Sequence, residues 1–167
     1  MPKSSVTLAT VTIREATTSD AAILAALSTQ LGYPAQPEEA AERLSALGPD
    51  SAVLVAEENG AVLGWIHVCG MRFFQSPPFA EVGGLVVDEA SRGKGVGKLL
   101  LDAGARWAAE RGYRKLRVRS NVIREDTHRF YERESFRRVK TQVVLDRELG
   151  QEVRLPRRDP GSGLPSC

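Results

Sequence analysis

The chain is poor in the side chains that bind metals or build disulfide frameworks. It has two cysteines, Cys69 inside an apolar stretch and Cys167 at the last position, and two histidines, His67 and His128. Two cysteines so placed form no framework and match no metal-ligand spacing. We therefore expect no metal site and a reducing compartment.

Two further absences narrow the class of protein. No apolar run approaches the roughly 18 residues of a membrane span, and the N-terminus lacks the charged and apolar regions of a signal peptide. Lys+Arg 23 against Asp+Glu 21 gives a net charge of +2, which is too balanced for a protein that neutralises many phosphates. We expect a cytoplasmic protein with no membrane partner, and nucleic acid is a disfavoured partner.

The 167 residues, 42% hydrophobic and 26% charged, suit one globular domain. Hydrophobic periodicity predicts elements in the order β-α-α-β-β-β-α-β-α-β. The expected elements are residues 11–15, 21–31, 37–47, 52–58, 61–68, 80–87, 95–111, 116–118, 126–134 and 139–145. We expect the domain to span residues 11–146, between a flexible N-terminus (1–10) and a disordered tail (147–167) rich in Pro, Gly, Ser and charge.

Local signals refine the central strands. Asn59-Gly60 between two alternating segments predicts a β-hairpin. Ser76-Pro77-Pro78 predicts an interruption before the following strand, and the paired Gly83-Gly84 inside that strand predicts a bulge or a close backbone approach.

The most informative segment is a buried strand that passes through a glycine-rich turn into a helix, from Leu85 to Leu100. Glycines at 93, 95 and 97 allow successive backbone N–H groups to face one concavity, and a helix N-terminus adds partial positive charge. The segment is therefore an anion site that suits a pyrophosphate.

Spacing excludes two common phosphate motifs. A Walker A loop would need Ser or Thr where Leu99 stands and glycine where Arg92 stands. A dinucleotide fingerprint would need glycine at Lys98, and it would open a βαβ unit rather than follow a hairpin.

The remaining pattern, Arg92-Gly93-Lys94-Gly95-Val96-Gly97, resembles the pyrophosphate loop of the GNAT acyltransferase superfamily. A second family motif follows: Asn121 ends a strand, and residues 128–136 are similar to the family's Phe-Tyr-x-x-x-Gly-Phe, with Ser135 in place of glycine. The resemblance covers about residues 11–145. It implies a mixed α/β, three-layer fold whose mostly antiparallel sheet splays between strands four and five, with helices on both faces.

The resemblance also implies acetyl transfer from acetyl-CoA to a primary amine of a small molecule or peptide, by direct attack in a ternary complex. It implies that backbone groups of the fourth strand hydrogen-bond the pantetheine arm of the cofactor and that the glycine-rich loop binds its pyrophosphate. A residue at the end of the fifth strand would also contact the cofactor. The residues so assigned are Leu85, Val86, Val87, Arg92, Gly93, Lys94, Gly95, Val96, Gly97, Lys98 and Asn121.

Two residues match the catalytic positions of the family. Tyr131 matches the general acid that protonates the leaving thiolate, and Glu81, eleven residues before Arg92, has the spacing of a general base in histone-type members. Packing roles stay open for both. His67 and His128 are alternative bases, although a lone histidine is more often a packing residue.

Two other functions stay open on the sequence alone. One is a coenzyme A binding or sensing module without catalysis, and the other is an anion or nucleic-acid binding module. The second would use residues 111–140, which hold eleven basic residues against four acids, a pattern more often found on a solvated face.

The acceptor pocket is expected from two segments, Leu31–Pro37 and Arg72–Phe79. Their aromatic side chains could shape an apolar wall or, equally, a homodimer surface. These residues are Tyr33, Phe73, Phe74 and Phe79.

Overall fold

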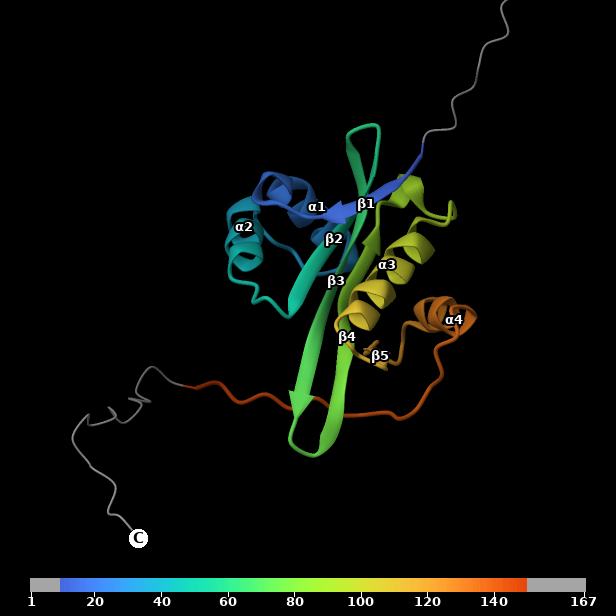
Figure 1. The fold of residues 1–167 in the computed structure, drawn as a ribbon. Coiled ribbons are helices and arrows are strands. Elements are labelled where there is room, and N and C mark those ends of the chain that lie inside the picture. Colours follow the sequence, from blue (N-terminus) through green and yellow to red (C-terminus); the bar gives the residue numbers. More distant parts are fainter. Residues whose placement is uncertain (1–9, 150–167) are drawn as a thin grey trace, which may run out of the picture.

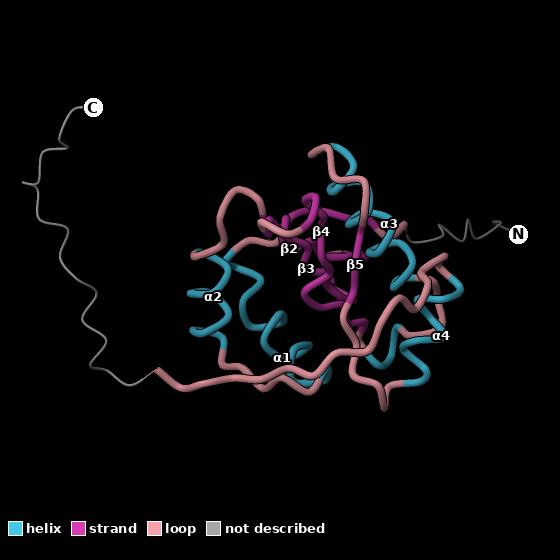
Figure 2. Tube along the Cα trace, turned by 90° about the horizontal axis from the view of Figure 1, so that it is seen from below, coloured by secondary structure: helices cyan, strands magenta, loops and turns pink. Residues whose placement is uncertain are grey.

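The structure, a computed structural model, describes residues 10–149 as a three-layer α/β fold (Figure 1). The strands are β1 (Thr12–Glu15), β2 (Ser51–Glu58), β3 (Ala61–Phe73), β4 (Ser76–Val87) and β5 (Leu116–Val118). The helices are α1 (Ala21–Leu31), α2 (Pro37–Ser45), α3 (Val96–Glu110) and α4 (Glu125–Arg133), with 3₁₀ turns η1 (Thr18–Asp20) and η2 (Glu89–Ser91). Figure 2 shows α1 and α2 on one side of the sheet and α3 and α4 on the other.

The sheet has the strand order β1-β2-β3-β4-β5. All neighbours are antiparallel except β4 and β5, which are parallel. Asn59 (φ 51°) and Gly60 (φ 79°) join β2 to β3 with both residues at positive φ, as a type I′ hairpin turn requires. The expected mostly antiparallel sheet and its hairpin are confirmed.

The core lies mainly between the sheet and α3. Leu100 of α3 and Ile66 of β3 are fully buried there. Gly104 lets the helix lie close to the sheet, since a Cβ at that position would be 2.9 Å from Cδ1 of Ile66. On the opposite face, Leu27 of α1 is fully buried as well. Side chains are therefore buried on both faces of the sheet.

An ion-pair network joins β1 to η1 and β2. Arg14 donates two hydrogen bonds of 2.9 Å to the carboxylate of Asp20 and one of 2.7 Å to Glu57. Asp20 also accepts a bond from the backbone N–H of Thr17. The Arg14 guanidinium, opposed by burial and supported by Thr17, lowers the pKa of Asp20 to about 2.

The hairpin of β3 and β4 is longer than the sequence predicts. Pro77 and Pro78 interrupt nothing: β3 continues to Phe73, and β4 begins at Ser76. This part of β4 lies beyond the residues that pair with β5, and its register with β3 shifts between Met71 and Phe73. Neither proline therefore has a register partner, and the missing N–H groups break no regular ladder hydrogen bond.

The prediction of a last strand at residues 139–145 is wrong. The described chain from 137 to 149 belongs to no strand or helix. The flexible terminus expected for residues 1–10 and the tail expected for residues 147–167 lie largely outside the described residues. Within residues 10–149, no helix is long and apolar enough to cross a membrane.

Candidate active site

The sheet opens between β4 and β5 at a bulge. β5 pairs with β4 only from Ala80 to Val82. On the other side of β4, the register shifts so that His67 pairs with Gly84 and Val68 with Val82, which leaves Gly83 as the extra residue. The predicted bulge and splay are confirmed. From Gly83 to Val87, the edge of β4 that faces β5 therefore has no strand partner.

The glycine-rich turn leads from this open edge to α3. Gly93 (φ 76°) and Gly95 (φ 82°) adopt left-handed conformations, and a Cβ at either would meet nothing within 4 Å. Arg92 Nε donates to the carbonyl oxygen of Val87 at 3.1 Å, which ties the turn to β4. Helix α3 begins at Val96, so the N–H groups of its first turn have no intrahelical acceptor. The turn and the start of α3 therefore present open backbone donors, an arrangement that suits an anion.

The side chain of Lys98 lies elsewhere. Its Nζ donates to Asp102 at 3.0 Å and to Glu134 at 3.1 Å, and these bonds raise its pKa. Lys98 thus joins α3 to the end of α4, and the part of it that faces the loop is its backbone N–H.

A hollow of about 130 Å³ occupies the splay. It is bounded by the bulge of β4, the end of β5, the first turns of α4 and the end of α1. Its lining residues are Leu31, Tyr33, Val82, Gly83, Gly84, Leu85, Val118, Arg119, Ser120, Asn121, Arg124, Thr127 and Tyr131. The structure therefore brings together Leu85, Asn121 and Tyr131, three of the residues that the sequence assigns to the site.

Tyr131 is a buried phenol on the wall of this hollow. Its ring makes edge contacts with Phe130 and Phe136, at centroid distances of 5.2 and 5.3 Å. Burial raises its pKa to about 12. The hydroxyl therefore stays protonated at neutral pH and can give a proton.

Glu81 lies beside the hollow but is not one of its lining residues. Its Oε2 is 3.3 Å from Nε of Arg119, which does line the hollow, and its side chain is only 13% exposed. Because Oε2 has no partner in hydrogen-bond geometry among the described residues, the ion pair leaves it a lone pair to accept a proton.

Of the two histidines, His67 lies closer to the bulge. Its Nε2 shares a hydrogen bond of 2.8 Å with Ser51 Oγ, and a Cβ at Gly83 would be 2.5 Å from its Nδ1. Burial lowers its pKa, so the ring is neutral. His128 instead bonds the carbonyl oxygen of Asn121 at 3.0 Å and holds the turn before α4.

Asn121 shapes that same turn. Its side-chain oxygen accepts from the N–H of Ile123 at 3.2 Å. Its carbonyl oxygen accepts from the N–H of Arg124 at 3.0 Å. The side-chain amide nitrogen, which is a donor only, is the group left to reach a ligand.

Cys69 is a poor nucleophile. Burial, together with the charges of Glu81 and Asp50, raises the pKa of its thiol, which disfavours the thiolate. Within residues 10–149, no group of three His, Cys, Asp or Glu side chains could hold a metal ion.

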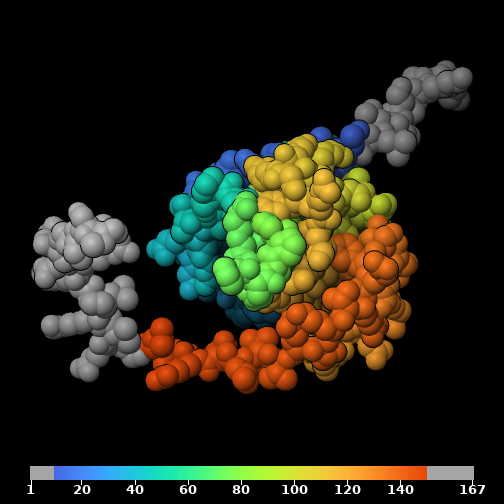
Figure 3. All heavy atoms as spheres, turned by 60° about the horizontal axis from the view of Figure 1, so that its bottom comes forward, coloured from blue at the N-terminus to red at the C-terminus, as the bar shows by residue number. Residues whose placement is uncertain are grey.

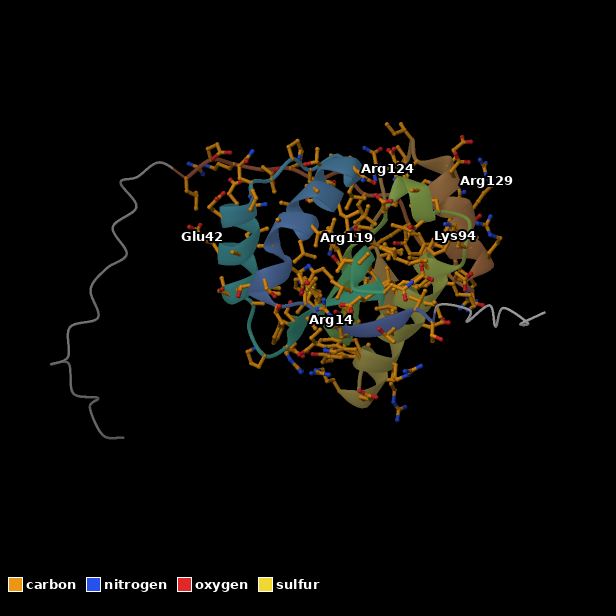
Figure 4. All side chains as sticks on the ribbon, turned by 90° about the horizontal axis from the view of Figure 1, so that it is seen from above. Arg14, Glu42, Lys94, Arg119, Arg124 and Arg129 are labelled. Atoms are coloured by element: carbon orange, nitrogen blue, oxygen red, sulfur yellow. The ribbon has the colours of Figure 1, made fainter. Side chains whose placement is uncertain are left out.

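Sequence reasoning missed Arg119 and Arg124 as site residues and placed them only in the basic segment 111–140. Both side chains line the hollow, and Figure 4 labels them. Arg124 also donates to the carbonyl oxygen of Leu31 at 3.0 Å, which holds the end of α1 against the β5–α4 turn. The signal that could have found them is their place around Asn121, directly after the strand that lines the slot.

Only one of the two segments expected to form the acceptor pocket lines the hollow. Tyr33 lines the hollow, as predicted for the segment Leu31–Pro37. The segment Arg72–Phe79 instead forms the far end of the β3–β4 hairpin. There the ring centroids of Phe73 and Phe79 lie 5.9 Å apart. The guanidinium carbon of Arg117 lies 4.1 Å from the centroid of the Phe79 ring, so this part of the basic segment packs on an aromatic side chain.

Comparison with known proteins decides what kind of site this is. Residues 21–136 match the family described as acetyltransferase (GNAT). The chain belongs to this family. The resemblance seen in the sequence is confirmed, and the protein is an N-acetyltransferase.

Two curated relatives of this acetyltransferase are informative. An aminoalkylphosphonate N-acetyltransferase of Salmonella typhimurium (strain LT2) is 33% identical over 75% of this chain and 84% of its own. A Bacillus subtilis (strain 168) protein, named provisionally as a phosphinothricin acetyltransferase, is 40% identical over 50% of this chain. The match spans about half of the Bacillus protein, 52% of its length.

Solved structures show the same fold. The aminoglycoside N-acetyltransferase AAC(6')-Iy, solved with CoA, aligns with a TM-score of 0.74 at 18% identity, over 84% of this acetyltransferase and 95% of that chain. Glucosamine-6-phosphate N-acetyltransferase from Arabidopsis thaliana aligns with a TM-score of 0.70 at 22% identity, over 83% and 99%. The expected three-layer fold is thereby confirmed.

Proposed function

We propose that this acetyltransferase moves an acetyl group from acetyl-CoA to the primary amine of a small molecule, by direct attack in the hollow between β4 and β5. The observation that carries the proposal is the unpaired edge of β4, continuous with an open glycine turn at the N-terminus of α3. An extended amide chain followed by a pyrophosphate has the shape and the chemistry that this edge and turn would bind.

In this proposal the backbone of Leu85, Val86 and Val87 holds the pantetheine arm as an added strand would be held. The N–H groups from Arg92 to Lys98 hold the pyrophosphate, and the side-chain amide of Asn121 donates to the arm from the other wall. The thioester then lies at Gly83, beside Tyr131.

Proton transfer is assigned to two side chains. The amine must be neutral to attack, so Glu81 takes its proton through a water beside Arg119, and Tyr131 protonates the departing thiolate. The raised pKa of Tyr131 means that the phenol is protonated when the thiolate departs. His67, neutral and next to the bulge, is the alternative proton acceptor.

The acceptor is further proposed to carry an acidic group. Arg119 is engaged by Glu81, whereas the side-chain contact of Arg124 is one carbonyl oxygen among the described residues, which leaves guanidinium donors for a ligand. A guanidinium presents several donors that match phosphonate or carboxylate oxygens. The names of both relatives denote amines that carry a phosphorus acid, which supports the same chemistry here.

The test uses paired acceptors and detects the CoA thiol released. We expect 2-aminoethylphosphonate to be acetylated with kcat/KM at least tenfold above propylamine, which has an amine on a similar chain but no anion. Arg124→Gln should abolish this preference. Arg129→Gln, on α4 but outside the hollow and paired with Asp126, should keep it.

The outcomes separate the parts of the proposal. Equal rates for both amines would overturn the acidic acceptor and leave amine acetylation standing. Binding of acetyl-CoA without thiol release across amino acids, polyamines, aminoglycosides and peptides would instead favour a module that binds the cofactor without catalysis.

A further inference from the structure

Two arginines flank the turn between α3 and β5, outside the hollow described above. Arg111 and Arg114 are both exposed, and neither pairs with a carboxylate within residues 10–149. Other arginines of the basic segment 111–140, such as Arg119 and Arg129, do form ion pairs. The α3–β5 turn therefore carries two positive charges that no described acidic side chain offsets.

The end of α3 fixes the position of this turn. The N–H groups of Gly112 and Tyr113 each donate to a carbonyl oxygen of the last turn of α3 at 3.0 Å. This is the Schellman pattern, and it uses the left-handed conformation of Gly112 (φ 82°). The guanidinium carbon of Arg111 lies 4.1 Å from the centroid of the Trp107 ring, which orients that side chain by a cation–π contact.

A third arginine reaches the same turn from the β3–β4 hairpin. Arg72 donates to the hydroxyl oxygen of Tyr113 at 3.1 Å, and that hydroxyl donates to Asp50 at 2.5 Å. Both partners lie directly over the backbone of β3, since a Cβ at Gly70 would overlap the Tyr113 hydroxyl and the Asp50 carboxylate. These contacts hold the Arg72 guanidinium beside the turn.

The three arginines line a pocket of about 270 Å³ between the hairpin and the turn. Figure 3 views this face, where the end of the β3–β4 hairpin, in green, lies beside the end of α3 and the following turn, in gold. No acidic residue is among the described residues that line it. We call it the arginine pocket, and its lining includes Arg72, Pro77, Pro78, Arg111, Tyr113 and Arg114.

The arginine pocket and the hollow lie at opposite ends of the β4–β5 pairing. The pairing begins at Ala80 with Leu116 and ends at Val82 with Val118. Pro77, Pro78 and the α3–β5 turn precede the first pair, whereas the hollow begins at the last one. No residue lines both, so the arginine pocket is separate from the site of acetyl transfer.

The charge balance indicates which anion the arginine pocket fits. Asp50 offsets one of the three guanidinium charges, and the C-terminal end of α3 is equivalent to about half a negative charge. Roughly +1.5 remains, which matches the charge of about −1.5 to −2 that a phosphate monoester carries at neutral pH. Guanidinium donors also match the geometry of phosphate oxygens.

We propose that the arginine pocket is a second ligand site, which binds the phosphate monoester of a small organic molecule. The phosphate lies among the three guanidiniums, and the organic part packs on Pro77 and Pro78. A volume of about 270 Å³ is close to the lower limit of ordinary small-molecule sites, roughly 300 Å³, so the organic part is no larger than one ring. The site involves neither acetyl-CoA nor the acceptor amine.

Calorimetric titration of phenyl phosphate into the full chain, without acetyl-CoA, tests the site. We expect a submillimolar Kd, and no binding of benzyl alcohol, which has the ring but no phosphate. Arg111→Gln and Arg114→Gln should each weaken phenyl phosphate binding at least tenfold. Arg133→Gln removes the same charge from the last turn of α4, outside both the arginine pocket and the hollow. It is the matched control and should bind like the parent.

Two further variants separate this site from the proposed site of acetyl transfer. Gly95→Asp and Arg124→Gln should keep phenyl phosphate binding, because neither residue lines the arginine pocket. Binding that these two variants lose, and that Arg111→Gln and Arg114→Gln keep, would place the phosphate at the acetyl-transfer site and overturn the inference.

Hydrogen exchange of the same samples identifies the contact. Phenyl phosphate should slow exchange of the amides of residues 72–76 and 111–115 and leave those of residues 83–87 unchanged. Protection confined to residues 83–97 would overturn the inference. Absence of binding by the parent at millimolar phenyl phosphate would also overturn it, as would equal affinities in the parent, Arg111→Gln and Arg114→Gln.

Discussion

Val82 and Val118 form the last register pair between β4 and β5, and the next residue of β4, Gly83, is the bulge residue in the pairing of β4 with β3. Apart from the proposed bases, Glu81 and His67, the residues proposed for the active site lie beyond this pair. The parallel strands separate there, the backbone of β4 becomes available to an extended ligand, and Tyr131 faces the opening from α4. The proposed catalytic slot therefore begins at one extra residue in β4.

Tyr131→Phe tests the general acid. The substitution keeps the ring contacts with Phe130 and Phe136 but removes the proton, so turnover should fall roughly 10²-fold with acetyl-CoA affinity unchanged. Steady-state kinetics and a cofactor titration measure the two quantities. Phe130→Leu, which changes a neighbouring ring and no proton, is the control. An unchanged kcat in Tyr131→Phe would exclude the acid role.

The pH profiles of Glu81→Gln and His67→Gln show which of the two residues is the general base. If Glu81 is the base, Glu81→Gln should lose most activity at low pH, and the loss should shrink as pH rises because more acceptor amine is already neutral. If His67 is the base instead, His67→Gln should be the defective variant, and the lowered pKa of the buried His67 ring should keep it an active base in the parent on the acid side of neutrality. Parent-like profiles for both would assign proton removal to water or to the acceptor.

Asp20→Asn tests the network that joins β1 to η1. Because Arg14 lowers the folded-state pKa of Asp20 to about 2, the ion pair contributes stability above pH 4 that is lost as pH falls towards 2. Arg14 is partly exposed, so we expect a contribution of about 1 kcal/mol. Denaturant unfolding should show that the parent loses this amount more than Asp20→Asn between pH 5 and pH 2. Parallel losses would mean that the pair contributes nothing.

Ser135→Gly tests strain at the end of α4. Ser135 has φ 68°, in the left-handed region that favours glycine, and the family usually has glycine in this motif. We expect the variant to gain about 0.5–1 kcal/mol in urea unfolding. Ser135→Ala retains the Cβ and should gain nothing. Equal stabilities of all three proteins would show that the turn is unstrained.

Local chemistry explains why much of this architecture could be predicted. Asn59 and Gly60 both adopt the positive φ that a tight hairpin turn requires, so the pair predicts the turn by itself. Gly83-Gly84 inside an apolar run predicts the bulge that the structure contains. The turn from Gly93 to Gly97 also follows from short-range signals. Each of these features depends on residues that are neighbours in the chain.

The features that escaped prediction depend on distant residues. The pairing of Arg119 with Glu81 joins the residue after β5 to β4, and the bond from Arg124 to Leu31 joins the residue before α4 to the end of α1. Residues 139–145 have strand character, but whether a strand pairs depends on an edge that its own sequence does not describe. The prediction at Pro77 and Pro78 was wrong for the same reason, since only the strand pairing shows that they lie opposite a register shift and beyond the end of β5.

Calorimetric titration of acetyl-CoA into the parent, Gly95→Asp and Gly112→Asp tests the central claim most directly, that the open β4 edge and the glycine turn bind the cofactor. Both glycines have φ 82°, and a Cβ at either would meet nothing within 4 Å, but only Gly95 lies in the glycine-rich turn before α3. We expect the parent and Gly112→Asp to bind equally, with saturating cofactor raising the melting temperature by several degrees. Gly95→Asp should fold and lose binding, because its carboxylate occupies the place of the phosphates. Undiminished binding by folded Gly95→Asp, or no binding by the parent at millimolar acetyl-CoA, would contradict the account.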